Sequence, residues 1–244
     1  MNEYGLIGYP LEHSFSKKYF TKKFEREGLD ARYTLFPIKD IYGLNHIISG
    51  NPDLKGLNVT IPYKQLVLTR LDSRSNIPDG LSACNCIKII NGKLHGYNTD
   101  AIGFELSLFP YILSHHTKAL ILGNGGAAAA VKYIFQKNNI GYTVVSRKIN
   151  DGSSLTYAEL DKHIISDHTI IINTTPLGMF PFTDACPDIP YTALTNKHLL
   201  YDMVYNPGIT LFLKKGAGQG AAVLNGYEML VIQAEESWRI WNEK

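Results

Sequence analysis

One stretch decides the predicted fold: Lys118-Ala-Leu-Ile-Leu-Gly-Asn-Gly-Gly-Ala-Ala-Ala-Ala-Val131. Residues 119–122 are apolar, as in a short buried strand, and the alanines after the glycines begin a helix. The glycines permit a tight turn and let the backbone approach a ligand closely, because they carry no Cβ. Unpaired amides at a helix start, with the positive end of the helix dipole, favour a pyrophosphate. A Gly-Gly turn can also be a plain turn, so both interpretations stay open here.

The same alternation of strand and helix continues on both sides of this stretch. Downstream, residues 142–146, 169–173, 199–204 and 222–224 each contain a run of consecutive apolar residues and no alternation, as expected of parallel strands that are covered on both faces. Upstream, Asn91-Gly92 between two apolar runs predicts a hairpin. The chain therefore divides near residue 103 into two α/β halves, of which the second is a Rossmann-like, doubly wound half.

Composition excludes several function classes. The chain has 244 residues, enough for two cores of roughly 100–150 residues each. Its 24 Lys+Arg against 22 Asp+Glu give no charge pattern for nucleic acid or an acidic membrane. Apolar runs are too short to span a bilayer, and the start does not match a secretion signal. Three cysteines favour a reducing compartment, the cytoplasm, and Cys84-x-Cys86 lacks a second ligand pair for a metal.

The end of the second downstream strand indicates which dinucleotide is bound. Units that bind NAD carry an acidic residue about 20 positions after the glycines, which holds the ribose 2′-hydroxyl. Here the sequence reads Val144-Val-Ser-Arg-Lys148, with two cations that can pair with a 2′-phosphate. We therefore expect NADP(H), while a solvated Arg-Lys pair remains the plain alternative. Asp151, a few residues further on, is the acid that could contradict this expectation.

The first half contains the candidate proton chemistry. Asn58-Val-Thr-Ile-Pro-Tyr-Lys64 predicts a helix opened by Pro62, with Lys64 in its first turn. The helix dipole disfavours a charged lysine there, which suits a side chain that exchanges a proton near neutral pH. The alternative is a lysine that extends into solvent.

Two further polar segments have equally plain alternatives. Asp100 in Asn98-Thr-Asp100 could be a functional carboxylate or a helix N-cap. Ser14 and Ser16 could both direct hydroxyls at a ligand carboxylate, although Ser16 could instead cap a helix over residues 16–27.

In combination, these motifs resemble the shikimate dehydrogenase family, in order over nearly the whole chain. The motifs are Gly8-x-Pro10-x-x-His13-Ser14-x-Ser16, Asn58-Val-Thr-x-Pro-Tyr-Lys64, Asn98-Thr-Asp100, Gly123-x-Gly-Gly-Ala127, Asn173-Thr-Thr-Pro-x-Gly-Met179, Tyr201-Asp-Met-Val-Tyr-Asn-Pro207 and Gly226-x-x-Met-Leu-x-x-Gln-Ala234. The second and third motifs at this separation are specific, whereas the glycine turn is not.

The resemblance implies a reversible, NADPH-dependent reduction of 3-dehydroshikimate to shikimate. Lys64 and Asp100 match the family's catalytic pair. The residues that it implies for the substrate are Ser14, Ser16, Thr60, Asn85, Tyr205 and Gln233. Those that it implies for the cofactor are Gly123, Asn124, Gly125, Gly126, Ala127, Ser146, Arg147, Lys148, Thr174, Met203 and Gly226.

The resemblance also implies the domain boundaries and the binding partners. Gly226, Met229 and Gln233 share one face of the last helix, which would return to the first domain. The substrate-binding domain is then residues 1–103 plus 225–244, and the NADP-binding domain is residues 104–224. The expected partner is the small-molecule substrate. We expect the protein to bind no nucleic acid, membrane or metal and to be a monomer or homodimer.

The sequence departs from the family pattern at a few positions and leaves two competing functions open. The departures are Lys17 for proline, Cys86 for threonine, Asn124 for alanine, and Ser146 and Lys148 flanking the arginine. One alternative is a quinate/shikimate dehydrogenase of relaxed cofactor use. The other is a catalytically silent ligand-binding homologue, which predicts loss of Lys64 or Asp100; both residues are present.

Overall fold

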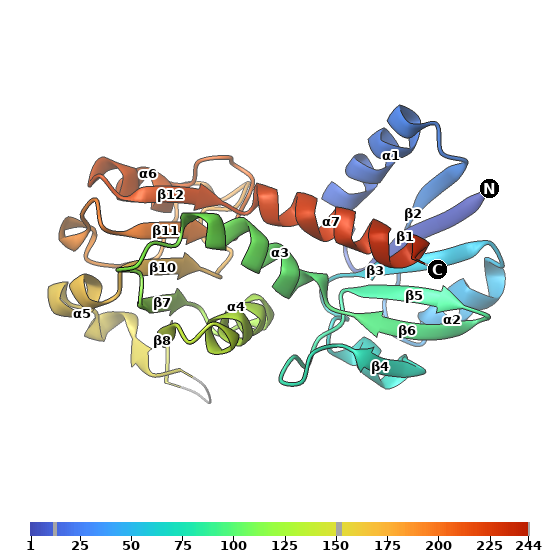
Figure 1. Ribbon diagram of the computed structural model, residues 1–244, viewed down its shortest axis with the longest axis horizontal. Coiled ribbons are helices and arrows are strands. Elements are labelled where there is room, and N and C mark those ends of the chain that lie inside the picture. Colours follow the sequence, from blue (N-terminus) through green and yellow to red (C-terminus); the bar gives the residue numbers. More distant parts are fainter. Residues whose placement is uncertain (12–13, 150–152, 244) are drawn as a thin grey trace. The chain divides into compact units, whose positions relative to one another are not determined.

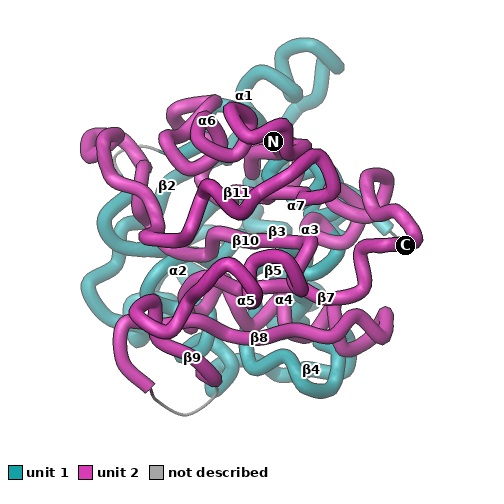
Figure 2. Tube along the Cα trace, turned by 90° about the vertical axis from the view of Figure 1, so that its left-hand side faces the viewer, with its two compact units in different colours: residues 1–102, 230–244 teal, residues 103–229 magenta. Residues whose placement is uncertain are grey.

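The computed structural model describes residues 1–11, 14–149 and 153–243. These residues form two compact units, residues 1–102 with 230–244 and residues 103–229 (Figure 2). Each unit is built on its own six-stranded sheet. No helix within the described part of the chain is long and apolar enough to cross a bilayer.

The sheet of the first unit is mixed. Its strands are β1 (Asn2–Gly8), β2 (Ala31–Pro37), β3 (Leu54–Val59), β4 (Ser73–Asn76), β5 (Cys86–Ile90) and β6 (Lys93–Tyr97). They lie in the order β2-β1-β3-β5-β6-β4, and β5 runs antiparallel to both β3 and β6. Asn91 and Gly92 both have positive φ, 50° and 75°, as the predicted two-residue hairpin between β5 and β6 requires.

The two faces of this sheet bury different side chains because residues alternate along a strand. Tyr4 of β1 packs with Phe20 of α1 (Phe15–Glu27) and Trp241 of α7 (Tyr227–Asn242). Ile7 lies in a second cluster with Leu44 of α2 (Gly43–Gly50). The Trp241 indole N–H donates to the Ile87 carbonyl at 3.0 Å. As predicted, most of the last helix therefore belongs to the first unit (Figure 1).

The sheet of the second unit is entirely parallel. Its strands are β7 (Lys118–Leu122), β8 (Gly141–Ser146), β9 (Leu155–Thr156), β10 (Ile170–Asn173), β11 (Leu199–Asp202) and β12 (Ala222–Asn225). Their order is β12-β11-β10-β7-β8-β9, and Figure 1 labels the strands from β12 to β8 in this order. Counted from β7 as the first, this is the 3-2-1-4-5-6 order of the dinucleotide-binding Rossmann fold. The predicted fold class is confirmed.

Helices cover both faces of this parallel sheet, which explains its continuously apolar strands. Leu120 and Leu122 of β7 lie in one cluster with side chains of α5 (Lys162–Asp167) and α6 (Leu211–Gly218). The ring centroid of Phe104 on α3 (Thr99–Leu108) lies 5.7 Å from that of Phe135 on α4 (Gly126–Lys137). Phe104 also lies 5.4 Å from Tyr201 of β11, so α3 and α4 meet against the sheet.

Some helices are shorter than the sequence predicts. The α-helix expected after Pro62 is instead a 3₁₀ helix, η1 (Leu66–Arg70), so that prediction is wrong. Two short helices, η3 (Tyr157–Glu159) and α5, follow β9, and α5 begins separately because Asp161 accepts a capping bond from Ile164 N at 2.8 Å. Further 3₁₀ turns are η2 (Phe109–Tyr111) and η4 (Tyr191–Ala193).

Candidate active site

Lys64 and Asp100 form an ion pair in the first unit. Lys64 Nζ lies 2.7 Å from Asp100 Oδ2, and the two side chains are 33% and 13% exposed. Asp100 is in the first turn of α3, where Asn98 Oδ1 accepts the Ala101 N–H at 3.1 Å. Asn98 therefore caps the helix, and the alternative in which Asp100 is the N-cap is wrong. The Asp100 carboxylate is left to hold the lysine.

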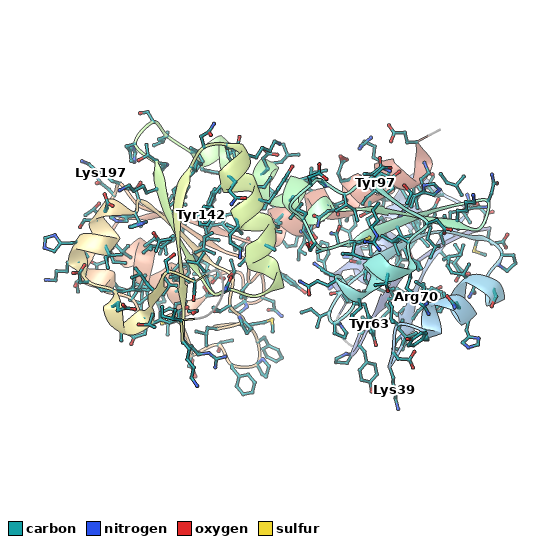
Figure 3. The ribbon with its side chains drawn as sticks, turned by 90° about the horizontal axis from the view of Figure 1, so that it is seen from below. Lys39, Tyr63, Arg70, Tyr97, Tyr142 and Lys197 are labelled. Atoms are coloured by element: carbon teal, nitrogen blue, oxygen red, sulfur yellow. The ribbon has the colours of Figure 1, made fainter. Side chains whose placement is uncertain are left out.

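Lys64 lies in a turn that precedes η1, not in a helix. Its carbonyl accepts the Cys84 N–H at 2.7 Å, so it does not enter an intrahelical bond. The neighbouring Tyr63, labelled in Figure 3, is buried and donates its hydroxyl to the Ile38 carbonyl at 2.6 Å. The segment is thus held from two sides. The charge of Asp100, rather than a helix dipole, determines where the ammonium lies.

Asn85 connects the ion pair to the neighbouring strand. Its side-chain Oδ1 accepts the Thr99 N–H at 2.6 Å, and Nδ2 donates to Thr99 Oγ1 at 2.9 Å. Its carbonyl accepts the Val59 N–H at 2.9 Å, next to Thr60. Because an amide nitrogen carries two hydrogens, one remains for a ligand. The structure therefore gathers Thr60, Lys64, Asn85 and Asp100 in one part of this unit.

The two serines have different roles from those expected for capping. Ser14 is the N-cap of α1, and its Oγ accepts the Lys17 N–H at 3.2 Å. Its hydroxyl hydrogen stays available for donation. Ser16 lies inside the helix and hydrogen-bonds Tyr33, so the interpretation of Ser16 as the cap is wrong. Burial raises the pKa of Tyr33 well above its usual range, which keeps its hydroxyl protonated.

The Asn58 side chain links Tyr33, Asn85 and the last helix by hydrogen bonds. Tyr33 donates its hydroxyl to Asn58 Oδ1 at 2.8 Å. Asn58 Nδ2 donates to Ser237 Oγ at 2.9 Å and to the Asn85 carbonyl at 3.3 Å. Ser237 in turn donates to the carbonyl of Gln233 on α7 at 2.8 Å. One polar network therefore reaches Ser16, Asn85 and Gln233.

In the second unit, the backbone conformation and the protein's own packing require a glycine at position 123. Its φ is 104°, a conformation that L side chains rarely adopt. A Cβ at this position would lie 2.7 Å from Thr174 Oγ1. Thr174 is held there because its N–H and its hydroxyl both donate to the Leu122 carbonyl, at 2.9 and 2.8 Å.

Packing within the protein does not require glycine at positions 125 and 126, since a Cβ at either position would meet no protein atom within 4 Å. Gly125 is the N-cap of α4 and provides no side-chain cap. Ala127 is exposed in the first helical turn. An open, uncapped helix start flanked by glycines fits a pyrophosphate, which can approach where side chains would obstruct it.

The end of β8 holds two exposed cations. The Ser146 hydroxyl donates to the Lys148 carbonyl and so closes a turn around Arg147. Arg147 and Lys148 are exposed, which suits a 2′-phosphate and also a solvated pair. Asp151, and His13 of the first motif, lie outside the described residues.

The remaining cofactor candidates follow β11 and β12. A Cβ on Gly226 would lie 2.3 Å from the Met203 carbonyl, so the two loops touch. Tyr205 follows Met203 in the second unit, and burial raises the pKa of its hydroxyl. Gly123, Ser146, Thr174, Met203 and Gly226 thus all lie at the carboxyl ends of parallel strands, the edge at which such sheets bind ligands. Among the described residues, no group of three or more His, Cys, Asp or Glu could hold a metal ion.

Comparison with known proteins identifies the family. Residues 6–87 match the model of the shikimate dehydrogenase substrate binding domain. A shikimate dehydrogenase (NADP(+)) of Clostridium beijerinckii is 40% identical over 255 residues, which cover 100% of this chain and 93% of the relative. The chain belongs to the shikimate dehydrogenase family.

Solved members of the shikimate dehydrogenase family have the same fold. A shikimate 5-dehydrogenase of Thermus thermophilus, in complex with NADP(H) and shikimate, has a TM-score of 0.87 and 26% identity, covering 100% of this chain and 94% of that chain. One from Listeria monocytogenes, in complex with shikimate and NAD, has a TM-score of 0.87 and 27% identity, covering 100% and 92%.

Asp202 is a residue of the family motifs for which the sequence predicted no role. This buried carboxylate accepts bonds from Val204 N at 3.0 Å, Asn173 Nδ2 at 2.9 Å and Thr210 Oγ1 at 2.5 Å. It therefore ties the loop after β11 to the end of β10. Burial raises the pKa of Asp202 from an ordinary 3.8 to about 6. Its place at a strand end in the Tyr201–Pro207 motif was the available signal.

Proposed function

We propose that the chain catalyses the reversible, NADPH-dependent reduction of 3-dehydroshikimate to shikimate. The observation that carries the proposal is the partly exposed Lys64–Asp100 ion pair at 2.7 Å, within reach of a network of neutral hydrogen-bonding side chains. The relatives named NADP(+)-dependent shikimate dehydrogenase support both the substrate and the cofactor.

The ion pair suits proton transfer to a carbonyl oxygen. When bound, NADPH supplies the hydride that reduces the carbonyl. The Lys64 ammonium stabilises the negative charge that develops on the substrate oxygen and donates the proton to it. Asp100 holds the ammonium through Oδ2, and its other oxygen can accept a hydrogen bond from a substrate hydroxyl.

Neutral side chains of the first unit would hold the rest of the substrate. Ser14 donates its hydroxyl to the substrate carboxylate, and Ser16 does the same when its hydrogen turns from Tyr33 to the substrate. The free N–H of Asn85 serves a ring hydroxyl. Thr60 and Gln233 bind further hydroxyls, and the same role is proposed for Tyr205. Several weak neutral donors suit a hydroxylated acid that must be released after each turnover.

The second unit would hold the cofactor along the carboxyl ends of its strands. Gly123, Asn124, Gly125, Gly126 and Ala127 receive the pyrophosphate, with the α4 amides as donors. Ser146, Arg147 and Lys148 form the 2′-phosphate site. Thr174, Met203 and Gly226 border the remainder of the dinucleotide.

The domain roles follow from this assignment. The proposed substrate-binding domain comprises residues 1–103 plus 225–244, and the NADP-binding domain residues 104–224. With three free cysteines, two of them buried, the reducing cytoplasm is the proposed compartment, and the proposed assembly is a monomer or homodimer. Light scattering on the purified protein measures that assembly directly.

The decisive experiment is turnover by the purified protein. We expect loss of reduced-nicotinamide absorbance when NADPH and 3-dehydroshikimate are mixed, with less activity when NADH replaces NADPH. Lys64→Met should lower kcat by roughly 10²–10⁴-fold, because it removes the proton donor. Lys118→Met is the matched control, since it breaks a surface pair with Asp167 of similar length, 2.6 Å. No turnover by the wild type would reject the enzyme, and faster oxidation of quinate than of shikimate would favour the quinate alternative.

A further inference from the structure

A lysine of α4 lies at the glycine turn, and the proposed function gives it no role. Lys132 Nζ donates to Asn124 Oδ1 at 3.0 Å. Asn124 stands between Gly123 and Gly125, so the ammonium lies beside the turn that is proposed to receive the pyrophosphate. The Lys132 residue is partly buried there and not extended into solvent.

The sequence of α4 explains why this side chain reaches back to the turn. Helical side chains lean toward the helix N-terminus and over the residues three and four positions earlier. For Lys132 these residues are Ala129 and Ala128. Because neither extends beyond Cβ, the lysine stem can follow the helix surface down to Asn124.

The charge of Lys132 lacks an anionic partner in the described part of the chain. Lys137 of the same helix, in contrast, pairs with Glu105 at 2.8 Å. The positive end of the helix dipole disfavours a cation near the turn, and the neutral oxygen of Asn124 offsets a full charge only in part. A dianionic group at the open helix start would complete the arrangement.

We infer that Lys132, held in place by Asn124, is an additional binding residue for the pyrophosphate of the dinucleotide. The inference rests on the proposed use of NADP(H). An ammonium carries three hydrogens, of which the bond to Asn124 uses one. Since the pyrophosphate is common to NADP and NAD, Lys132 strengthens the binding of both. Arg147, at the proposed 2′-phosphate site, favours NADP alone.

Equilibrium binding of three probes separates these contributions. Dissociation constants are measured for NADP⁺, for NAD⁺ and for adenosine 2′-monophosphate, which has no pyrophosphate. We expect Lys132→Met to weaken both dinucleotides by the same factor, roughly tenfold, and to leave adenosine 2′-monophosphate unchanged. The difference from wild type should shrink between about 0.01 M and about 1 M salt, because salt screens the ammonium.

Matched variants make the result specific. Lys137→Met removes the same charge from the far end of α4 and should bind all three probes as the wild type does. Lys132→Arg should restore most of the dinucleotide affinity, and Asn124→Ala should lose part of it, because the ammonium is no longer held. The inference is overturned if Lys132→Met binds NADP⁺ as tightly as the wild type, or weakens adenosine 2′-monophosphate equally. If the wild type binds neither dinucleotide, the proposed cofactor use fails first and the inference fails with it.

Discussion

The glycine turn can be tested by adding one methyl group at two of its positions. At Gly126 the added Cβ meets no protein atom within 4 Å, and the backbone has an ordinary φ. At Gly123 the φ is 104°, and the Cβ would lie 2.7 Å from Thr174 Oγ1 and 2.9 Å from Thr175 Cγ2. The same substitution should therefore affect the ligand at one position and the fold at the other.

The expected magnitudes follow from these environments. Gly126→Ala should leave the free energy of unfolding unchanged or raise it by about 0.4–1 kcal/mol, because alanine restricts the unfolded chain. Gly123→Ala should lower it by roughly 2–6 kcal/mol, the sum of the cost of a positive φ and that of overpacking. In contrast, Gly126→Ala should weaken NADPH binding by about 1–3 kcal/mol, because its methyl group enters the space proposed for the pyrophosphate.

Urea denaturation without cofactor gives the stabilities, and titration with NADPH gives the affinities. Since 1.4 kcal/mol is a factor of ten, Gly126→Ala should raise the dissociation constant roughly 5- to 150-fold. Gly218→Ala is the control, because Gly218 ends α6 and its Cβ also meets nothing. A Gly126→Ala variant that is as stable as the wild type and binds NADPH equally well would show that no pyrophosphate lies against Gly126.

Further predictions concern the phosphate site, a buried carboxylate and the polar network. Arg147→Ala should raise the KM for NADPH far more than that for NADH in steady-state assays; equal increases would reject a 2′-phosphate contact. Asp202→Asn removes a carboxyl whose pKa is raised to about 6 from 3.8. A carboxyl whose pKa is raised in the folded state stabilises the fold at pH values below its unfolded-state pKa. This stabilisation is lost as the pH rises through the folded-state pKa. The stability of Asp202→Asn relative to wild type should thus improve by about 2 kcal/mol from about pH 4.5 to about pH 7.5, and a constant difference contradicts this. Tyr33→Phe breaks the link between Ser16 and Asn58 and should raise the KM for shikimate but not for NADPH; additive effects of Tyr33→Phe and Ser16→Ala would show that the two are uncoupled.

Much of the fold could be predicted from local patterns. The continuously apolar strands of the second unit indicate burial on both faces, and the glycine turn after β7 marks the first strand of a doubly wound sheet. Asn91-Gly92 specifies its hairpin because both residues tolerate positive φ. The paired Lys64 and Asp100 were predicted as candidates from their motifs, and the structure brings their side chains to 2.7 Å.

Local patterns failed where a distant segment uses a backbone or side-chain group. Pro62 indicates a helix start. The helix does not form there because the Lys64 carbonyl accepts a hydrogen bond from the Cys84 N–H. Ser16 has the residue type of a cap, but the chain begins α1 one residue after Ser14. Capping preferences are worth only about 1 kcal/mol, so tertiary contacts readily shift a helix end.

By itself, the sequence determined the two α/β units, the parallel sheet and the residue types that proton transfer and dinucleotide binding need. These depend on periodicity and on backbone freedom, which neighbouring residues set. Only the tertiary structure decided that Asn58 reaches Ser237, 179 positions away. Such contacts depend on how helices pack against sheets, because a hydrogen bond between side chains forms only where packing brings its donor and acceptor within about 3 Å.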